Sequence, residues 1–81
     1  MAWEQIAAQL GGQQIIFSMT IYNGRLYAGT HPNGLLLRLN SAGNAWEQVA
    51  AQYNGQTQIL SLVGFDNRLY GGTYPGGYLY R

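Results

Sequence analysis

The apolar residues of the chain come in short runs separated by turn residues. Residues 15–22 are almost wholly apolar, and residues 58–65 repeat this pattern. A short apolar run without alternation is typical of a strand covered on both faces, so we expect both runs to be buried on both sides. The pairs that follow, Asn-Gly at 23–24 and Asp-Asn at 66–67, tolerate positive φ and predict tight two-residue type I′ hairpin turns.

Three further kinds of run complete the pattern. One begins after the hairpin turn with large side chains and ends with small ones, one follows a proline-glycine turn, and one begins with tryptophan. Proline ends the first kind because it cannot donate a hydrogen bond to a sheet. The tryptophan runs could continue as helices, but short runs that alternate with turns favour strands throughout. In repeat-equivalent pairs, these runs are residues 25–30 and 68–73, residues 35–39 and 78–81, and residues 46–51 and 3–8.

The pattern recurs because the chain is one unit written twice. With an offset of 43 residues, residues 3–38 match residues 46–81 without a gap, and 19 of the 36 aligned pairs are identical. Strand-rich repeats of about 40 to 50 residues are typical of propellers and similar arrays, in which each unit buries its apolar faces only against copies of itself. We assign residues 1–81 to a single unit, with repeat 1 at 3–45 and repeat 2 at 46–81.

Each repeat is therefore expected to be a four-stranded antiparallel meander, and this looks like a propeller blade. The chain resembles the highly repetitive blades of bacterial β-propellers, and in style it is similar to tectonin-like lectins. The resemblance implies an all-β fold with two four-stranded antiparallel blades per chain, closing into a multi-chain propeller. So high an internal identity also fits an excised, reconstructed or designed fragment. The resemblance rests on Asn23, Gly24, the run 25–30 (Arg-Leu-Tyr-Ala-Gly-Thr), Pro32, Gly34 and Trp46.

The repeats are out of phase with the expected blades. Repeat 2 lacks a fourth strand, while residues 3–8 have the sequence of that strand and no blade of their own. Because a propeller needs about four to eight blades, we expect residues 3–8 of one chain to pair with residues 77–81 of the next in a cyclic ring. We prefer a homotrimer with six blades, and a tetramer with eight comes next. The expected assembly residues are Trp3, Ile6, Leu79 and Arg81.

Charge and composition narrow the possible partners. Four arginines, no lysine and three acidic residues give a net charge of +1, and the arginines form no cluster in the sequence. Nucleic-acid binding is therefore not expected. No run approaches the roughly 18 apolar residues of a membrane span, and the first residues do not form a signal peptide. We expect a soluble chain without a membrane partner, cytoplasmic as written.

The sequence predicts no enzyme, no metal site and no cofactor. There is no cysteine, and one histidine cannot complete a metal site within a chain. His31 has no neighbouring acid to orient it, and its repeat equivalent is Tyr74. The strand aromatics are expected to pack between blades rather than against a ligand. They are Trp3, Phe17, Tyr27, Trp46 and Tyr70.

Four loops remain as candidate ligand sites. Residues 9–14 and 52–57 are expected to lie beside residues 31–34 and 74–77 on one face of a propeller. Their amides and flat rings suit neutral hydroxylated ligands, so a glycan-binding lectin is the alternative to self-assembly, although exposed loops of many proteins have this composition. The candidate residues are Gln9, Gln13, Gln14, His31, Asn33, Gln52, Tyr53, Asn54, Gln56 and Tyr74.

Overall fold

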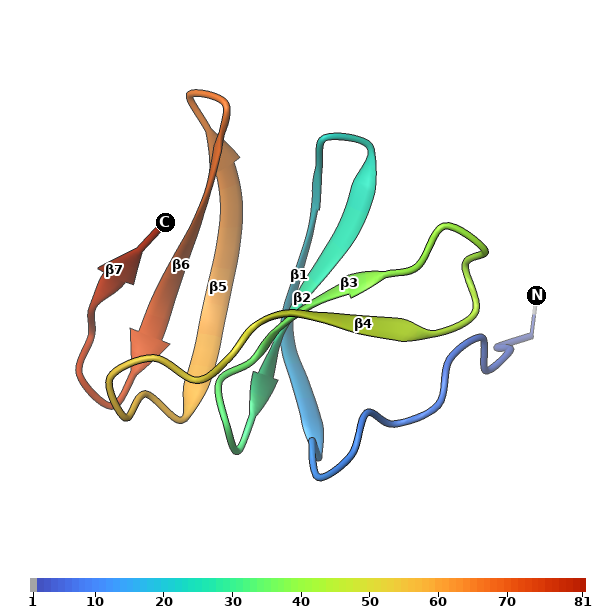
Figure 1. The fold of residues 1–81 in the computed structure, drawn as a ribbon, viewed down its shortest axis with the longest axis horizontal. Helices are drawn as coiled ribbons and strands as arrows, with labels where there is room; N and C mark the ends of the chain where they lie inside the picture. Colours follow the sequence, from blue (N-terminus) through green and yellow to red (C-terminus); the bar gives the residue numbers. More distant parts are fainter. Residues whose placement is uncertain (1) are drawn as a thin grey trace.

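A computed structural model describes residues 2–81 of the protein; Met1, which the expected unit 1–81 includes, lies outside the described residues. The described chain forms two antiparallel sheets and no helix (Figure 1). The first sheet has the order β1-β2-β3-β4 and the second β5-β6-β7, so both are meanders. The expected all-β antiparallel fold is confirmed. The strands are β1 (Ile15–Tyr22), β2 (Arg25–His31), β3 (Leu36–Leu39), β4 (Trp46–Ala50), β5 (Gln58–Phe65), β6 (Arg68–Tyr74) and β7 (Leu79–Tyr80).

The two hairpin turns form as the turn residues predict. Asn23 and Gly24 have φ of 54° and 72°, and Asp66 and Asn67 have φ of 53° and 61°. Positive φ at both central residues is the type I′ geometry, which suits the twist of the flanking strands. The turns therefore fix the pairing of Tyr22 with Arg25 and the rest of the β1–β2 register.

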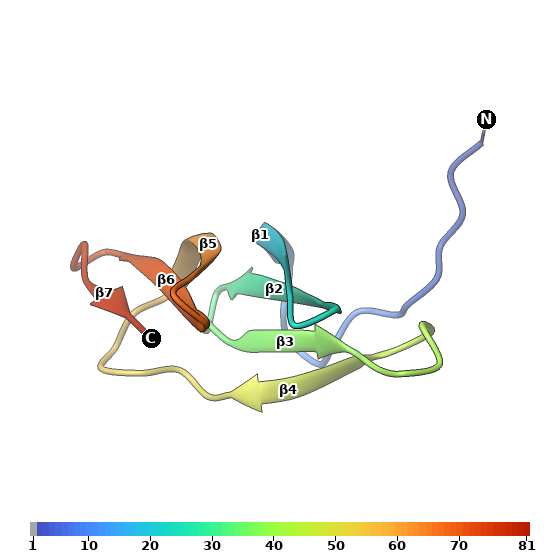
Figure 2. The ribbon, with the colours of Figure 1, turned by 90° about the horizontal axis from the view of Figure 1, so that it is seen from above.

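Residues 3–8 are the exception among the expected strands. The segment is irregular, and in both views it runs away from the sheets (Figures 1 and 2). Its repeat equivalent, β4, pairs with β3, whereas residues 3–8 meet no open sheet edge within this chain. A strand needs such an edge for its backbone hydrogen bonds, so residues 3–8 form no strand within the single chain, and their pairing with a neighbouring copy stays a prediction.

The two sheets meet where β5 packs against β1 and β2. Ser18 Oγ donates a hydrogen bond of 3.0 Å to the carbonyl oxygen of Ile59. Beside it, Gly29 leaves no room for a side chain, since a Cβ there would lie 2.5 Å from Cβ of Ile59. The absence of a side chain at Gly29 therefore allows the second sheet to approach the backbone of the first.

The core lies on the other face of the first sheet. Ala28, Leu35 and Leu37 are buried together, with Leu10 and Trp46 packed against them. Ala28 and Gly29 point to opposite faces because side chains alternate along a strand. The residues of this cluster come from the loop before β1, from β2, from β3 and the residue before it, and from β4.

β1 is much more exposed than its composition predicts. Ile16, Met19 and Ile21 are 45%, 60% and 75% exposed, although complete burial was expected. β1 is an edge strand of its sheet, and the second sheet covers only part of it. The prediction of burial on both faces is wrong for the single chain, and the same holds for β5, where Val63 and Phe65 are 56% and 69% exposed.

Candidate functional site

The two sheets differ along one edge. In the first sheet β3 lies between β2 and β4, with Leu37 opposite Gln48, Arg38 opposite Glu47 and Leu39 opposite Trp46. In the second sheet β7 pairs with β6 alone among the described residues. β7 therefore presents one row of free backbone groups, which is a template for another strand.

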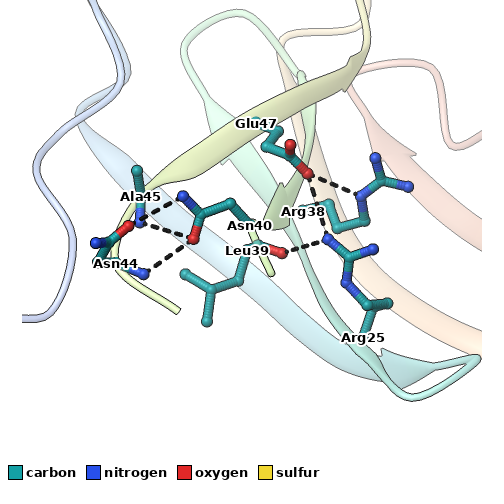
Figure 3. A network of polar contacts seen from close by, with 7 residues as sticks. All are labelled: Arg25, Arg38, Leu39, Asn40, Asn44, Ala45 and Glu47. Atoms are coloured by element: carbon teal, nitrogen blue, oxygen red, sulfur yellow. Dashed lines mark hydrogen bonds and ion pairs between the residues drawn. The ribbon is translucent and has the colours of Figure 1, made fainter. Parts of the chain in front are cut away.

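A polar network holds β4 to the first sheet (Figure 3). One carboxylate oxygen of Glu47 accepts from Arg38 Nε at 3.1 Å and from Arg25 Nη2 at 3.4 Å. The same nitrogen of Arg25 donates to the carbonyl oxygen of Leu39 at 3.0 Å. Three strands, β2, β3 and β4, thus meet at a single glutamate.

The loop between β3 and β4 is braced beside this network. Asn40 Oδ1 accepts from the backbone N–H groups of Asn44 and Ala45 at 3.0 and 3.3 Å (Figure 3).

The pKa of Arg38 is raised above its usual value, first by its hydrogen bond to Tyr27 and then by Glu47. Arg38 is therefore a permanent cation, and the pairing depends on the glutamate.

The two arginines of the second sheet have no such partner among residues 2–81. Within residues 2–81, both ion pairs involve Glu47. The repeat equivalents of Arg25 and Arg38 are Arg68 and Arg81, and both are exposed. The equivalent of Glu47 is Glu4, which is exposed in the irregular segment. The structure does not bring these three residues together within one chain.

The apolar assembly residues are also exposed. Trp46 is half-buried against the core of the first sheet, whereas Trp3, its repeat equivalent, is 100% exposed. Ile6 is 52% exposed and Leu79 70%. Trp3 therefore packs against neither sheet in the single chain, and its packing between the blades of a ring stays a prediction. Its exposure leaves a large apolar ring without a packing partner.

An open groove of about 990 Å³ lies between the sheets, on the face of the second sheet that corresponds to the core of the first. Gly71, Tyr80 and Tyr53 line it, at the repeat positions of Ala28, Leu37 and Leu10. The rings of Tyr53 and Tyr80 meet edge to face with centroids 4.8 Å apart. The hydroxyl of Tyr80 is buried and has no hydrogen-bond partner in the described chain.

The candidate ligand loops do lie side by side, and buried glutamines join them. Gln13 Oε1 accepts from Thr30 Oγ1 at 2.8 Å, and Gln13 Nε2 donates to Asn33 Oδ1 at 2.9 Å. In repeat 2, Gln56 Oε1 accepts from Thr73 Oγ1 at 3.0 Å and from the N–H of Gly76 at 2.8 Å. These amides brace the loops.

Two more amides of the loops are occupied in the same way. Gln9 Nε2 donates to the carbonyl oxygen of Gln13, and Gln52 Nε2 to that of Gln56, at 2.6 and 3.0 Å. Gln14 and Asn54 are exposed. The loops also expose two rings, Tyr53 and Tyr74, which are 65% and 52% exposed.

His31 packs against an aromatic ring of its own repeat. Its imidazole meets Phe17 edge to face, with centroids 5.8 Å apart. Its Nδ1 atom is buried, with no hydrogen-bond partner in residues 2–81. No group of three or more His, Cys, Asp or Glu residues in that range could hold a metal ion.

Sequence reasoning missed the threonines that organise these loops. Thr30 Oγ1 accepts from the N–H of Leu35 at 3.0 Å, and Thr73 Oγ1 accepts from that of Tyr78 at 3.2 Å. The missed signal is the identity of both Gln and Thr in the two repeats. The same signal was available for the arginines and the glutamate of the ion-pair network.

The described chain has no helix that could cross a membrane. A comparison with models of known protein families finds no match, and comparisons with curated proteins and with solved structures find none either.

Proposed function

We propose that the chain is a self-assembling β-propeller fragment, in which copies join head to tail into a closed ring. One observation carries the proposal: β7 has a free edge, and residues 3–8, which lie unpaired, have nearly the sequence of the strand that covers the equivalent edge of the first sheet. Only Ile6, which is Val49 in β4, differs between the two six-residue segments 3–8 and 46–51. We call the contact of residues 3–8 of one copy with β7 of the next the seam.

The faces of the sheets support the same arrangement. Within the chain, Ile59 of the second sheet packs on Gly29 of the first. The equivalent glycine of the second sheet, Gly72, meets only Ser61 Oγ of its own sheet, and the equivalent isoleucine of the first sheet, Ile16, is 45% exposed. The two free surfaces are therefore copies of two surfaces that already fit together.

A second position repeats this relation. Gly34, with φ of 57°, lies so close to the loop before β5 that a Cβ would come within 2.5 Å of the carbonyl oxygen of Gln56. Its equivalent, Gly77, has a φ of 66°, and a Cβ placed there would meet nothing within 4 Å. In the ring, the loop around Gln13 of the next copy fills this space. A surface that is complementary to a different surface of the same molecule produces a ring when the rotation from copy to copy closes, which is the arrangement of propeller blades.

A ring also removes the exposed apolar surface that the single chain carries. The exposed side chains of β1 and β5, together with Trp3, are a liability for an isolated soluble chain. Three chains give six blades and four give eight, and we prefer three. No catalytic step, cofactor or nucleic-acid partner is part of the proposal.

The measurement that tests the proposal is the mass of the folded protein in solution. Native mass spectrometry and light scattering are expected to give a single species of three times the chain mass of 8.9 kDa, or else four times. A folded monomer that persists at high concentration would overturn the proposal. An open series of sizes without a preferred mass would also contradict it, because a ring closes at one number.

A further inference from the structure

We propose, resting on the assembly above, that Glu4 of one copy binds Arg68 and Arg81 of the neighbouring copy. Glu4 then occupies the place that Glu47 holds between Arg25 and Arg38 within the chain. The site is incomplete in one chain and is built from two copies. Its ion pairs determine how the two strands of the seam are paired.

The first argument is the geometry of the intrachain network. Arg38 and Glu47 are directly opposite each other across β3 and β4, and Arg25 reaches the same carboxylate oxygen from β2. Arg68 begins β6 and Arg81 follows β7, at the positions that Arg25 and Arg38 hold in the first sheet. The second sheet thus presents two of the three members of the network.

The second argument is the distribution of charge over the chain. Four arginines and three acids give seven charged side chains, and three of them form the network of the first sheet. Arg68 and Arg81 line the open groove and are exposed, and Glu4 is exposed on the unpaired segment. The seam therefore joins a surface with two cations to a segment with one anion. Such complementarity directs association and excludes wrong partners.

The third argument is strand register. If the seam copies the β3–β4 pairing, Arg81 lies opposite Glu4 of the neighbour, Tyr80 opposite Gln5 and Leu79 opposite Ala7. A slip of one residue would turn Glu4 to the other face of the sheet, away from both arginines. The ion pairs therefore select one register for a short strand pair.

The same charges select head-to-tail contacts. Two β7 edges that paired with each other would bring the arginines of two copies together and leave them without a carboxylate. Like charges at an interface are strongly unfavourable. The charges thereby protect the exposed edge of β7 from pairing with the same edge of another copy. Such symmetric pairing would give a dimer instead of a ring.

The experiment is a charge reversal followed by its compensation. E4R is expected to weaken each seam by about tenfold, because two favourable ion pairs become repulsive. The triple variant E4R/R68E/R81E is expected to restore assembly to within about threefold of the original chain, since attraction returns at every seam. Sedimentation equilibrium over a concentration series measures both, and far-UV circular dichroism checks that each variant is folded.

Salt and a matched pair of substitutions provide the controls. At about 1 M salt the screening length falls to about 3 Å, so the defect of E4R is expected to shrink. Glu4→Gln and Asp66→Asn each remove one carboxylate, and Asn tolerates the positive φ of position 66. Only Glu4→Gln is expected to weaken assembly.

The outcomes separate this proposal from the one it rests on. Suppose that the original chain forms rings. If E4R then assembles as well as the original chain, or if the triple variant assembles as weakly as E4R, the ion pairs at the seam are refuted while the ring stands. A defect of E4R that high salt leaves unchanged also refutes the pairing. If the original chain is a monomer, the assembly itself is refuted.

Discussion

The first and second sheets have closely related sequences and very different surroundings. Leu37 of β3 is 1% exposed, and Ala28 beside it is completely buried. In the second sheet, Tyr78 and Leu79 are 47% and 70% exposed, and Tyr80, the equivalent of Leu37, is half-buried. The first sheet has β4 along its edge and Leu10 and Trp46 on its core face. The burial of a repeat thus depends on what covers it more than on its own residues.

The polar clusters of the loops show the opposite behaviour. Gln13 with Thr30 and Gln56 with Thr73 make the same contacts in both repeats. All four residues are nearly completely buried, at 8%, 0%, 6% and 8% exposed. Each cluster is formed within its own repeat, so it needs no neighbour. The polar clusters of the loops are thus completed within one repeat, whereas the burial of a sheet depends on contacts with a second repeat.

Deletion of residues 2–8 should have the largest effect on this comparison. Without the segment, no strand is available for β7, and assembly should be lost completely. The segment is exposed and irregular in the single chain, so the fold of the two sheets should survive. Light scattering and circular dichroism measure the two results. Ile6→Val, which copies residues 46–51, is the control and should keep the ring; an unchanged mass after the deletion would contradict the seam.

The next test compares Leu37→Ala with Tyr80→Ala. In dilute, unassembled protein, Leu37→Ala should lower the free energy of unfolding by about 2–5 kcal/mol, because it empties a buried position. Tyr80 lines an open groove, so Tyr80→Ala should cost about 1–2 kcal/mol. Urea unfolding measures both values. Equal losses would show that the second sheet is as well covered as the first.

The glycine pair tests the contact between the sheets. Gly29→Ala should cost about 1–3 kcal/mol, since the new Cβ would overlap Ile59 and Ser18. Gly72→Ala meets only the hydroxyl of Ser61, at 2.9 Å, and should cost less in the unassembled chain while weakening the ring. Thermal unfolding and sedimentation separate the two effects. A ring that tolerates Gly72→Ala would exclude the neighbour's Ile16 from this position.

The smallest and most symmetric effects are expected for Gln13→Ala and Gln56→Ala. Each removes an acceptor from a buried threonine hydroxyl, which should cost about 1–2 kcal/mol in either repeat. Chemical unfolding of the two variants measures this cost. A glycan array on the original chain and on both variants tests the lectin alternative: sugar binding that these substitutions abolish, with stability unchanged, would assign the glutamines to a ligand instead of the loops.

Much of the local structure could be predicted from the sequence. β1 and β5 have the expected bounds, and the paired positive-φ residues fix the hairpin turns. The loops that were expected to lie together do so, at Gln13 and Asn33 and at Gln56 and Gly76. The strands and turns follow from apolar runs and turn chemistry, which act over a few residues, whereas the position of the loops was expected from the resemblance to a propeller. The lectin assignment of the loop residues and the ring stay predictions.

The differences between these expectations and the single chain have a common cause. β1 was expected to be covered on both faces, and residues 3–8 were expected to form a strand, because their sequences are suited to a buried sheet. In the single chain Ile21 is 75% exposed and Trp3 is fully exposed. A pattern of side chains indicates which surfaces can be buried, but it does not state which part of a molecule provides the cover. The network of Glu47 was missed because three strands must be in register before its members meet.

The sequence by itself determined the repeat, the strands, the turns and the type of sheet, since each depends on neighbours in the chain or on residues one turn away. Only the tertiary structure decided which sheet face is closed, which edge is open and which charges are paired. Burial and ion pairing require surfaces from distant segments to meet. In the first sheet β4 covers the edge of β3. In the second sheet the equivalent edge of β7 has no partner strand within the described chain.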